Sequence, residues 1–119
     1  AYDLAYGLEG GHSYARILHA YGDATGRELA QTLINRVRGY DTIRVSDQSF
    51  AIDLITHEGR CYGALAFIGG QVNVIWARRT ILASGGAGQL WRESTNPKIA
   101  TADGHAMAYR AGATLADME

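Results

Sequence analysis

The sequence has little cysteine and no excess of charge of either sign, and each shortage excludes a class of protein. Cys61 is the only cysteine among 119 residues, so no disulfide forms within the chain and a reducing, cytoplasmic compartment is expected. Eleven basic and twelve acidic residues leave a net charge of -1, which argues against nucleic acid or an anionic membrane as partner. No apolar run is long enough to span a bilayer.

Proline is also scarce, whereas glycine is abundant. One proline stands against fifteen glycines, which indicates many tight turns or close backbone approaches. Apolar residues make up 47% of the chain, enough for one folded domain with a modest core. The chain begins without methionine and ends without a terminating signal, so we expect it to be part of something longer.

An apolar run that ends in a glycine cluster stands out near residue 85. Ile81, Leu82 and Ala83 are typical of a strand buried on both faces, as in a parallel sheet. The three glycines that follow within residues 85–88 let the backbone turn sharply and approach a ligand closely. Ligands of open α/β sheets bind beyond the carboxyl ends of such strands. The alternative is that these residues form a strand-to-loop turn that binds no ligand.

Two helices are predicted from apolar periodicity and terminal residues. The first covers residues 25–38, with Asp23 or Thr25 as its cap and Gly39 at its end. The second follows Asp103, runs from residue 105 to about residue 111, and stops at Gly112. Asp103 is expected to cap this second helix, because aspartate is among the favoured residues at that position.

The middle of the chain has the pattern of an antiparallel meander. Alternating apolar residues predict strands over residues 50–54, 61–68 and 72–76. Glu58-Gly59 and Gly69-Gly70 are turn signals between them. Residues 43–45 are predicted as a further short strand. Either these residues or segments outside this chain would be the parallel partner of residues 78–84. Residues 1–13 are expected to form a loop, and residues 15–19 a short extended segment.

Sites with a recognisable catalytic or metal-binding pattern are missing. The fingerprint G-x-G-x-x-G is absent, because Trp91 follows Gly86-Ala87-Gly88 where the third glycine would stand. The four histidines do not fall at metal-ligand spacings, so no metal is expected. Ser13 and Ser84 lack a nucleophile elbow. Glu9 lies among glycines, either as an exposed loop acid or as a carboxylate that receives an ammonium group.

A series of motifs in fixed order nevertheless resembles one family closely, the L-aspartate oxidases. These are FAD enzymes of quinolinate and NAD synthesis, related to the flavoproteins of succinate dehydrogenase and fumarate reductase. Single motifs are short, but the order and spacing are maintained along nearly the whole chain. The motifs occupy residues 9–13, 16–20, 23–28, 50–54, 83–88, 95–97, 101–104 and 106–113.

The resemblance implies an α/β fold, part of a Rossmann-like FAD-binding domain with an antiparallel β-meander and two helices. Residues 1–119 correspond to the middle and C-terminal part of that domain. A G-x-G-x-x-G unit would precede them, and a capping domain with the catalytic arginine would follow, so no catalytic residue is expected within them. The implied FAD contacts are Ala51 at the adenine, the loop residues Ala83, Ser84, Gly85 and Gly86, and Asp103.

The resemblance also implies a dicarboxylate substrate bound near Glu9, Gly10, His12 and Ser13. In L-aspartate oxidases an acid at the position of Glu9 faces the substrate ammonium, whereas the succinate and fumarate enzymes usually have an apolar aromatic residue. Fumarate or dioxygen would be the electron acceptor, and quinolinate synthase a protein partner. Ser84 stands where threonine is usual and Ala102 where glycine is usual. A succinate or fumarate flavoprotein and a non-catalytic binding domain are the alternatives.

Overall fold

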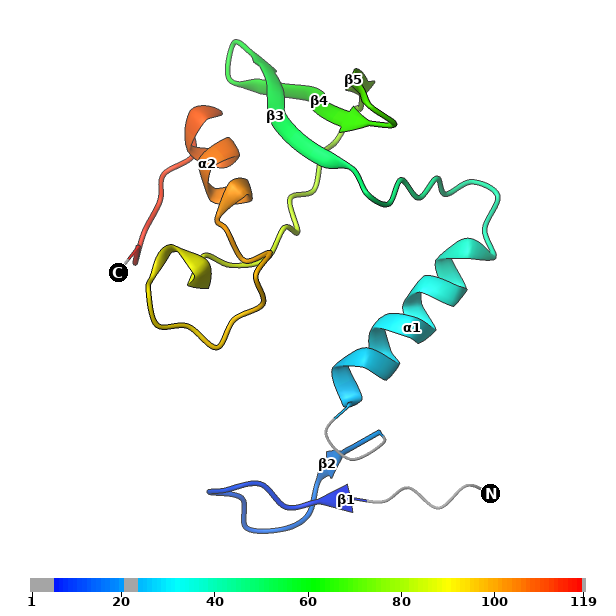
Figure 1. Ribbon diagram of the computed structural model, residues 1–119, viewed down its shortest axis with the longest axis vertical. Helices are drawn as coiled ribbons and strands as arrows, with labels where there is room; N and C mark the ends of the chain where they lie inside the picture. Colours follow the sequence, from blue (N-terminus) through cyan, green and yellow to red (C-terminus); the bar gives the residue numbers. More distant parts are fainter. Residues whose placement is uncertain (1–5, 21–23, 119) are drawn as a thin grey trace. The chain divides into compact units, whose positions relative to one another are not determined.

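The structure is a computed structural model that describes residues 6–20 and 24–118. It divides into two compact units, Ala1–Val45 and Ser46–Glu119, which we describe separately (Figure 1). The first unit contains β1 (Tyr6–Gly7), β2 (Ile17–Leu18) and α1 (Thr25–Arg38). The second contains β3 (Phe50–His57), β4 (Arg60–Ile68), β5 (Gln71–Trp76), the 3-10 helix η1 (Gly88–Leu90) and α2 (Asp103–Arg110).

The first unit begins with a small antiparallel pair. Tyr6 of β1 faces Leu18 of β2, and Gly7 faces Ile17. The prediction of a loop through residue 13 is therefore wrong at Tyr6 and Gly7, because their pairing partner lies ten residues or more further along the chain. The extended segment predicted around residues 15–19 is confirmed at Ile17–Leu18.

Helix α1 has the predicted extent of Thr25–Arg38. Its cap differs from the prediction, because Ala24 occupies that position without a side-chain hydrogen bond. The Thr25 hydroxyl instead accepts a hydrogen bond from the Ala20 amide at 3.1 Å, and Asp23 lies outside the described residues. Gly39 follows the last helical residue with φ -80, so the helix ends there without a left-handed residue.

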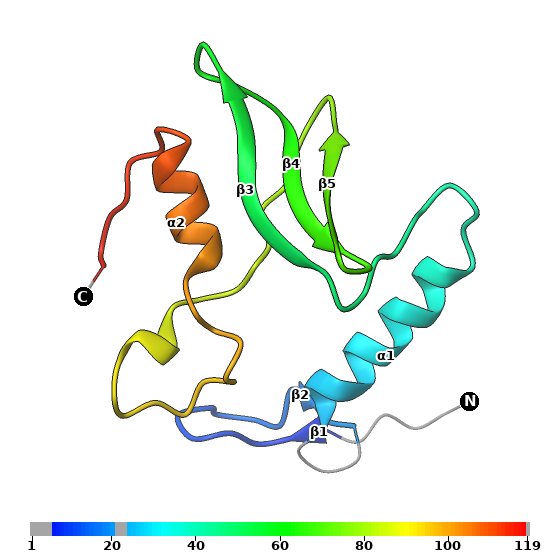
Figure 2. The same cartoon turned by 45° about the horizontal axis from the view of Figure 1, so that its top comes forward.

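The second unit is built on the predicted meander (Figure 2). Strands β3, β4 and β5 pair in that order, each antiparallel to its neighbour. Both connecting turns have two successive positive φ angles, at Glu58-Gly59 and at Gly69-Gly70. This is the conformation of the two-residue turns that match the twist of paired strands, which explains why the two turn signals located the hairpins correctly.

Two predicted strands are absent from the part of the chain that the structure describes. Residues 43–45 form no strand, and residues 78–84 form neither a strand nor a buried segment. Ile81 is 89% exposed. A strand requires a neighbour for its backbone N–H and C=O groups, and neither segment pairs with one among the described residues. Both strand predictions are therefore wrong, because an apolar pattern does not show whether a pairing segment is available.

Helix α2 lies beside β3 and begins earlier than predicted. It starts at Asp103, and Ala102 is the capping residue with φ 66. The prediction that Asp103 caps the helix is therefore wrong, because the left-handed turn at Ala102 places Asp103 in the first helical position. This left-handed turn accommodates the Cβ of Ala102. Gly112, with φ 94, follows the end of the helix as predicted.

Candidate functional site

The glycine loop, residues 83–88, lies against the segment that leads into α2. The Ala102 amide donates to the Gly86 carbonyl oxygen at 3.3 Å, and the Gln89 amide donates to the Ala100 oxygen at 2.9 Å. Ala100 is buried. These contacts bring the predicted loop residues and Asp103 to one region of the second unit.

Gly104 allows this close approach. A Cβ added to Gly104 would overlap the Ser84 hydroxyl and lie 3.0 Å from the Ser84 Cβ, so only glycine fits without a shift. Gly85 has φ 81, and a Cβ at Gly85 or Gly86 would meet nothing within 4 Å. The loop therefore packs tightly on α2 on one side and leaves open space on the other. A pocket of about 270 Å³ lies here, lined by Leu82, Ala83, Ser84, Gly85, Gly104, His105, Ala108 and Leu115.

Asp103 presents an exposed carboxylate at the start of α2. The Thr101 hydroxyl donates a hydrogen bond to its Oδ2. A carboxylate in the first helical turn is stabilised by the helix dipole. Its remaining lone pairs can accept hydrogen bonds from ligand hydroxyls.

Ala51 is the predicted cofactor residue that the structure does not bring to the glycine loop. It lies on β3, opposite Ala66 of β4. Within the described residues, no hydrogen bond connects it to residues 83–86. Its role at the adenine stays a prediction.

An ion pair that sequence reasoning missed holds α2 against the meander. Arg110 Nε donates to Asp53 Oδ2 at 2.8 Å, and the Leu54 amide donates to Asp53 Oδ1 at 2.9 Å. The hydrogen bond from Arg110 lowers the pKa of Asp53 below its usual value of 3.8, against partial desolvation that raises it. The partners are 57 positions apart, so no local pattern indicates the pair.

We expect Arg110→Gln in the full-length polypeptide to loosen α2 modestly at neutral pH. The pair is half-exposed, so it stabilises α2 against local opening by about 0.2–1 kcal/mol. Its loss should raise the amide hydrogen-exchange rates of α2 by up to about fivefold. The folded-state pKa of Asp53 is the lower one, so this stabilisation exists above the usual pKa and is lost as the pH falls through the folded-state pKa. Equal differences between wild type and variant at neutral pH and in acid would contradict this assignment.

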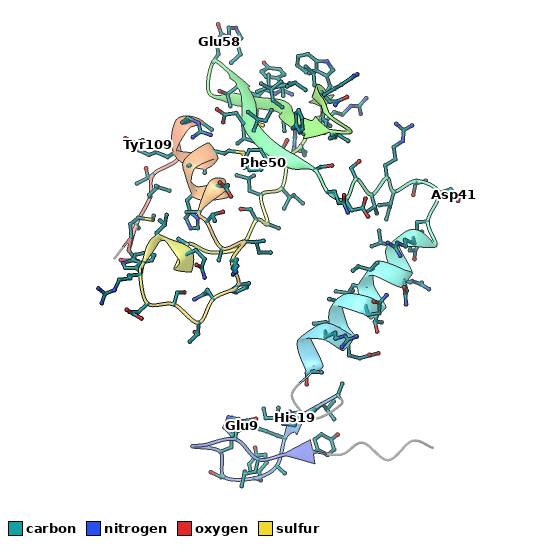
Figure 3. All side chains as sticks on the ribbon, in the orientation of Figure 1. Glu9, His19, Asp41, Phe50, Glu58 and Tyr109 are labelled. Atoms are coloured by element: carbon teal, nitrogen blue, oxygen red, sulfur yellow. The ribbon has the colours of Figure 1, made fainter. Side chains whose placement is uncertain are left out.

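The predicted substrate residues lie together in the first unit, in the connection between β1 and β2. The His12 amide donates to the Glu9 carbonyl oxygen at 3.1 Å, which closes a turn over residues 9–12. The Glu9 side chain is 55% exposed, and its Oε1 lies 3.4 Å from His19 Nε2 (Figure 3). Sequence reasoning missed this contact with His19. Gly10 and Ser13 are exposed in the same connection.

A histidine that binds no metal is ordinarily exposed or hydrogen-bonded, and two of the described histidines depart from this at one ring nitrogen each. Nδ1 of His12 and Nδ1 of His105 are buried and have no hydrogen-bond partner among the described residues. Within residues 6–20 and 24–118, no three potential ligands of the His, Cys, Asp and Glu types come together as a metal site. No helix in this part of the chain is both long and apolar enough to cross a membrane.

The sequence and the fold of this chain are both similar to those of known proteins. L-aspartate oxidase 1 of Ralstonia nicotianae is 45% identical over 93% of this chain. L-aspartate oxidase of Bacillus subtilis is 44% identical over 98% of it. The solved structure described as Mycobacterium smegmatis Sdh1 in complex with UQ1 matches 91% of the chain with a TM-score of 0.74 and 32% identity.

The chain spans 22% of the length of each of these two oxidases and 20% of the solved Sdh1 chain. The family model described as "FAD binding domain" matches residues 2–119. This match agrees with the mixed α/β fold. The chain belongs to the FAD-binding domain family of flavoproteins.

Proposed function

We propose that this chain is part of the FAD-binding domain of an L-aspartate oxidase, which converts L-aspartate to iminoaspartate. The observation that carries the proposal is the identity of 44–45% with two L-aspartate oxidases along nearly the whole chain. The identity with the solved Sdh1 chain is lower, at 32%.

The glycine loop fits a dinucleotide such as FAD. Gly85 and Gly86 offer backbone without side chains beside open space, and backbone N–H groups in such loops can approach a bound cofactor closely. Asp103 adds a carboxylate at the edge of the same region, suited to a ligand hydroxyl. In this proposal Ala83, Ser84, Gly85, Gly86 and Asp103 hold the cofactor, and Ala51 contacts its adenine.

Glu9 is the residue that we assign to substrate choice. Its carboxylate is partly exposed and can accept a charge-assisted hydrogen bond from the α-ammonium of aspartate. Gly10, His12 and Ser13 lie in the same connection, where they would complete the substrate contacts. FAD, when bound, supplies the two-electron acceptor for the substrate α-carbon.

The similarity to L-aspartate oxidases also suggests the electron acceptor, the protein partner and the compartment. The electron acceptor would be dioxygen or fumarate, the protein partner would be quinolinate synthase, and the compartment would be the cytoplasm. The catalytic arginine and the first phosphate-binding glycine unit would lie outside residues 1–119. We therefore expect these 119 residues alone to show no turnover.

The direct test is substrate oxidation by the purified full-length polypeptide with its flavin. We expect L-aspartate to be oxidised in air, with peroxide and ammonia as measurable products after hydrolysis of the imine. We expect no oxidation of succinate when an artificial electron acceptor is supplied. Copurified flavin absorbance is the first control, and its absence would favour the non-catalytic alternative.

A succinate or fumarate flavoprotein is the second candidate, favoured by the TM-score of 0.74 to the Sdh1 structure. The same assay separates the two. Succinate oxidation without aspartate oxidation would overturn the first proposal and support the second.

A further inference from the structure

A second side chain, His19, accompanies Glu9 in the connection between β1 and β2. His19 directly follows β2, and its Nε2 lies 3.4 Å from Glu9 Oε1. Both residues are labelled in Figure 3, where they come from the two arms of the same small hairpin. Because Gly7 is opposite Ile17 in the antiparallel hairpin, His19 is a diagonal neighbour of Gly7 across the two strands.

Gly7 provides the space for the His19 ring. A Cβ built at Gly7 would lie 2.5 Å from His19 Cδ2 and would overlap the imidazole. The ring therefore lies across the backbone of β1, and from there its Nε2 reaches the Glu9 carboxylate. The Arg16 amide donates to the Gly7 carbonyl oxygen at 3.1 Å, so a backbone hydrogen bond also holds Gly7 in the hairpin.

The backbone of Glu9 is also held, through the bond from the His12 amide to its carbonyl oxygen. The contact with His19 then restrains the one part of Glu9 that is otherwise free to rotate. A long acidic side chain loses rotamer freedom on binding, so a contact that selects one rotamer in advance reduces the cost of binding a ligand.

We infer that His19 is a positioning residue that orients the Glu9 carboxylate toward the ammonium group of an amino-dicarboxylate substrate. The inference rests on the proposed function, because it requires a substrate with an ammonium group. Nε2 of His19 lies 3.4 Å from one carboxylate oxygen of Glu9, and the second oxygen is the one that we assign to the substrate. A dicarboxylate without an amine, such as succinate, has no group for Glu9 to receive and gains nothing from this arrangement.

The test is His19→Phe in the full-length flavoprotein, with His19→Gln as the matched variant. Phenylalanine keeps a planar ring over Gly7 but cannot donate, so we expect the KM for L-aspartate to rise about 3- to 10-fold, with kcat changed less than about twofold. Glutamine carries an N–H donor and should restore most of the affinity. Succinate, measured as a competitive inhibitor of aspartate oxidation, should bind His19→Phe as tightly as the wild type, because it has no ammonium group for Glu9 to receive.

A third variant moves His19 without changing its chemistry. In Gly7→Ala the new Cβ displaces the imidazole, so the aspartate defect should match that of His19→Phe, with flavin content unchanged. Equal weakening of aspartate and succinate, or failure of glutamine to rescue, would show a merely structural role and overturn the inference. If the wild-type protein oxidises aspartate and His19→Phe has the same KM for aspartate as the wild type, only the inference about His19 is overturned. A wild-type protein that oxidises no aspartate would overturn the proposed function as well.

Discussion

Glu9→Gln in the full-length flavoprotein is expected to lower kcat/KM for L-aspartate by about 10- to 100-fold. Glutamine preserves the size of the side chain but removes its charge. A hydrogen bond to a charged group is worth about 1.5–3 kcal/mol, and each 1.36 kcal/mol corresponds to a factor of ten in rate. The measurement is steady-state oxidation of L-aspartate, alongside the affinity for succinate as a competing ligand, which should change little.

The chain offers a matched control for this substitution. Glu58 also lies near a histidine, with its Oε1 3.7 Å from His57 Nε2, but the pair is highly exposed at the β3–β4 turn. Glu58→Gln should leave aspartate kinetics unchanged. Glu9→Phe tests whether the protein is an L-aspartate oxidase or a succinate or fumarate enzyme. An apolar aromatic residue at this position should abolish the preference for aspartate over succinate. Unchanged aspartate kinetics in both Glu9 variants would exclude Glu9 from substrate recognition.

Gly104→Ala is expected to weaken FAD binding by about 5- to 100-fold. The added methyl group overlaps the Ser84 hydroxyl, and rotation of that hydroxyl leaves the Ser84 Cβ only 3.0 Å away. Overpacking of this kind costs about 1–3 kcal/mol, and here the strain falls on the loop that we assign to the cofactor. The measurement is the ratio of flavin to protein absorbance after purification, followed by titration of the apoprotein with FAD.

A compensating substitution distinguishes this steric cause from general misfolding. Ser84→Gly removes both atoms that the new methyl group would meet, so the double variant Ser84→Gly/Gly104→Ala should bind FAD better than Gly104→Ala alone. Such non-additivity is expected for residues in direct contact. If the double variant loses the sum of the two single effects, the contact between the loop and α2 is not what positions the cofactor.

Local features of this protein were predictable because their causes are local. The extent of α1 follows from an apolar periodicity and the glycine after Arg38. The two turns of the meander follow from residue pairs that accept positive φ. The FAD-binding family was likewise identified from motifs whose order and spacing are visible in the chain, and the family model confirms it.

Features that depend on distant partners were decided only by the tertiary structure. Residues 81–83 carry an apolar strand pattern, yet a strand forms only where another segment accepts its backbone hydrogen bonds, and none of the described residues does so. Asp103 was predicted as a cap with the helix starting at residue 105, but the left-handed conformation of Ala102 makes Asp103 the first helical residue.

The family, the meander and the helices could be predicted from residue order, because motifs, turn residues and apolar periodicity act over a few positions. Only the tertiary structure placed Gly104 against Ser84, paired Asp53 with Arg110, and brought His19 to Glu9. The partners in these pairs are ten or more positions apart, and their contacts depend on how the intervening chain folds back. No spacing rule encodes such a contact.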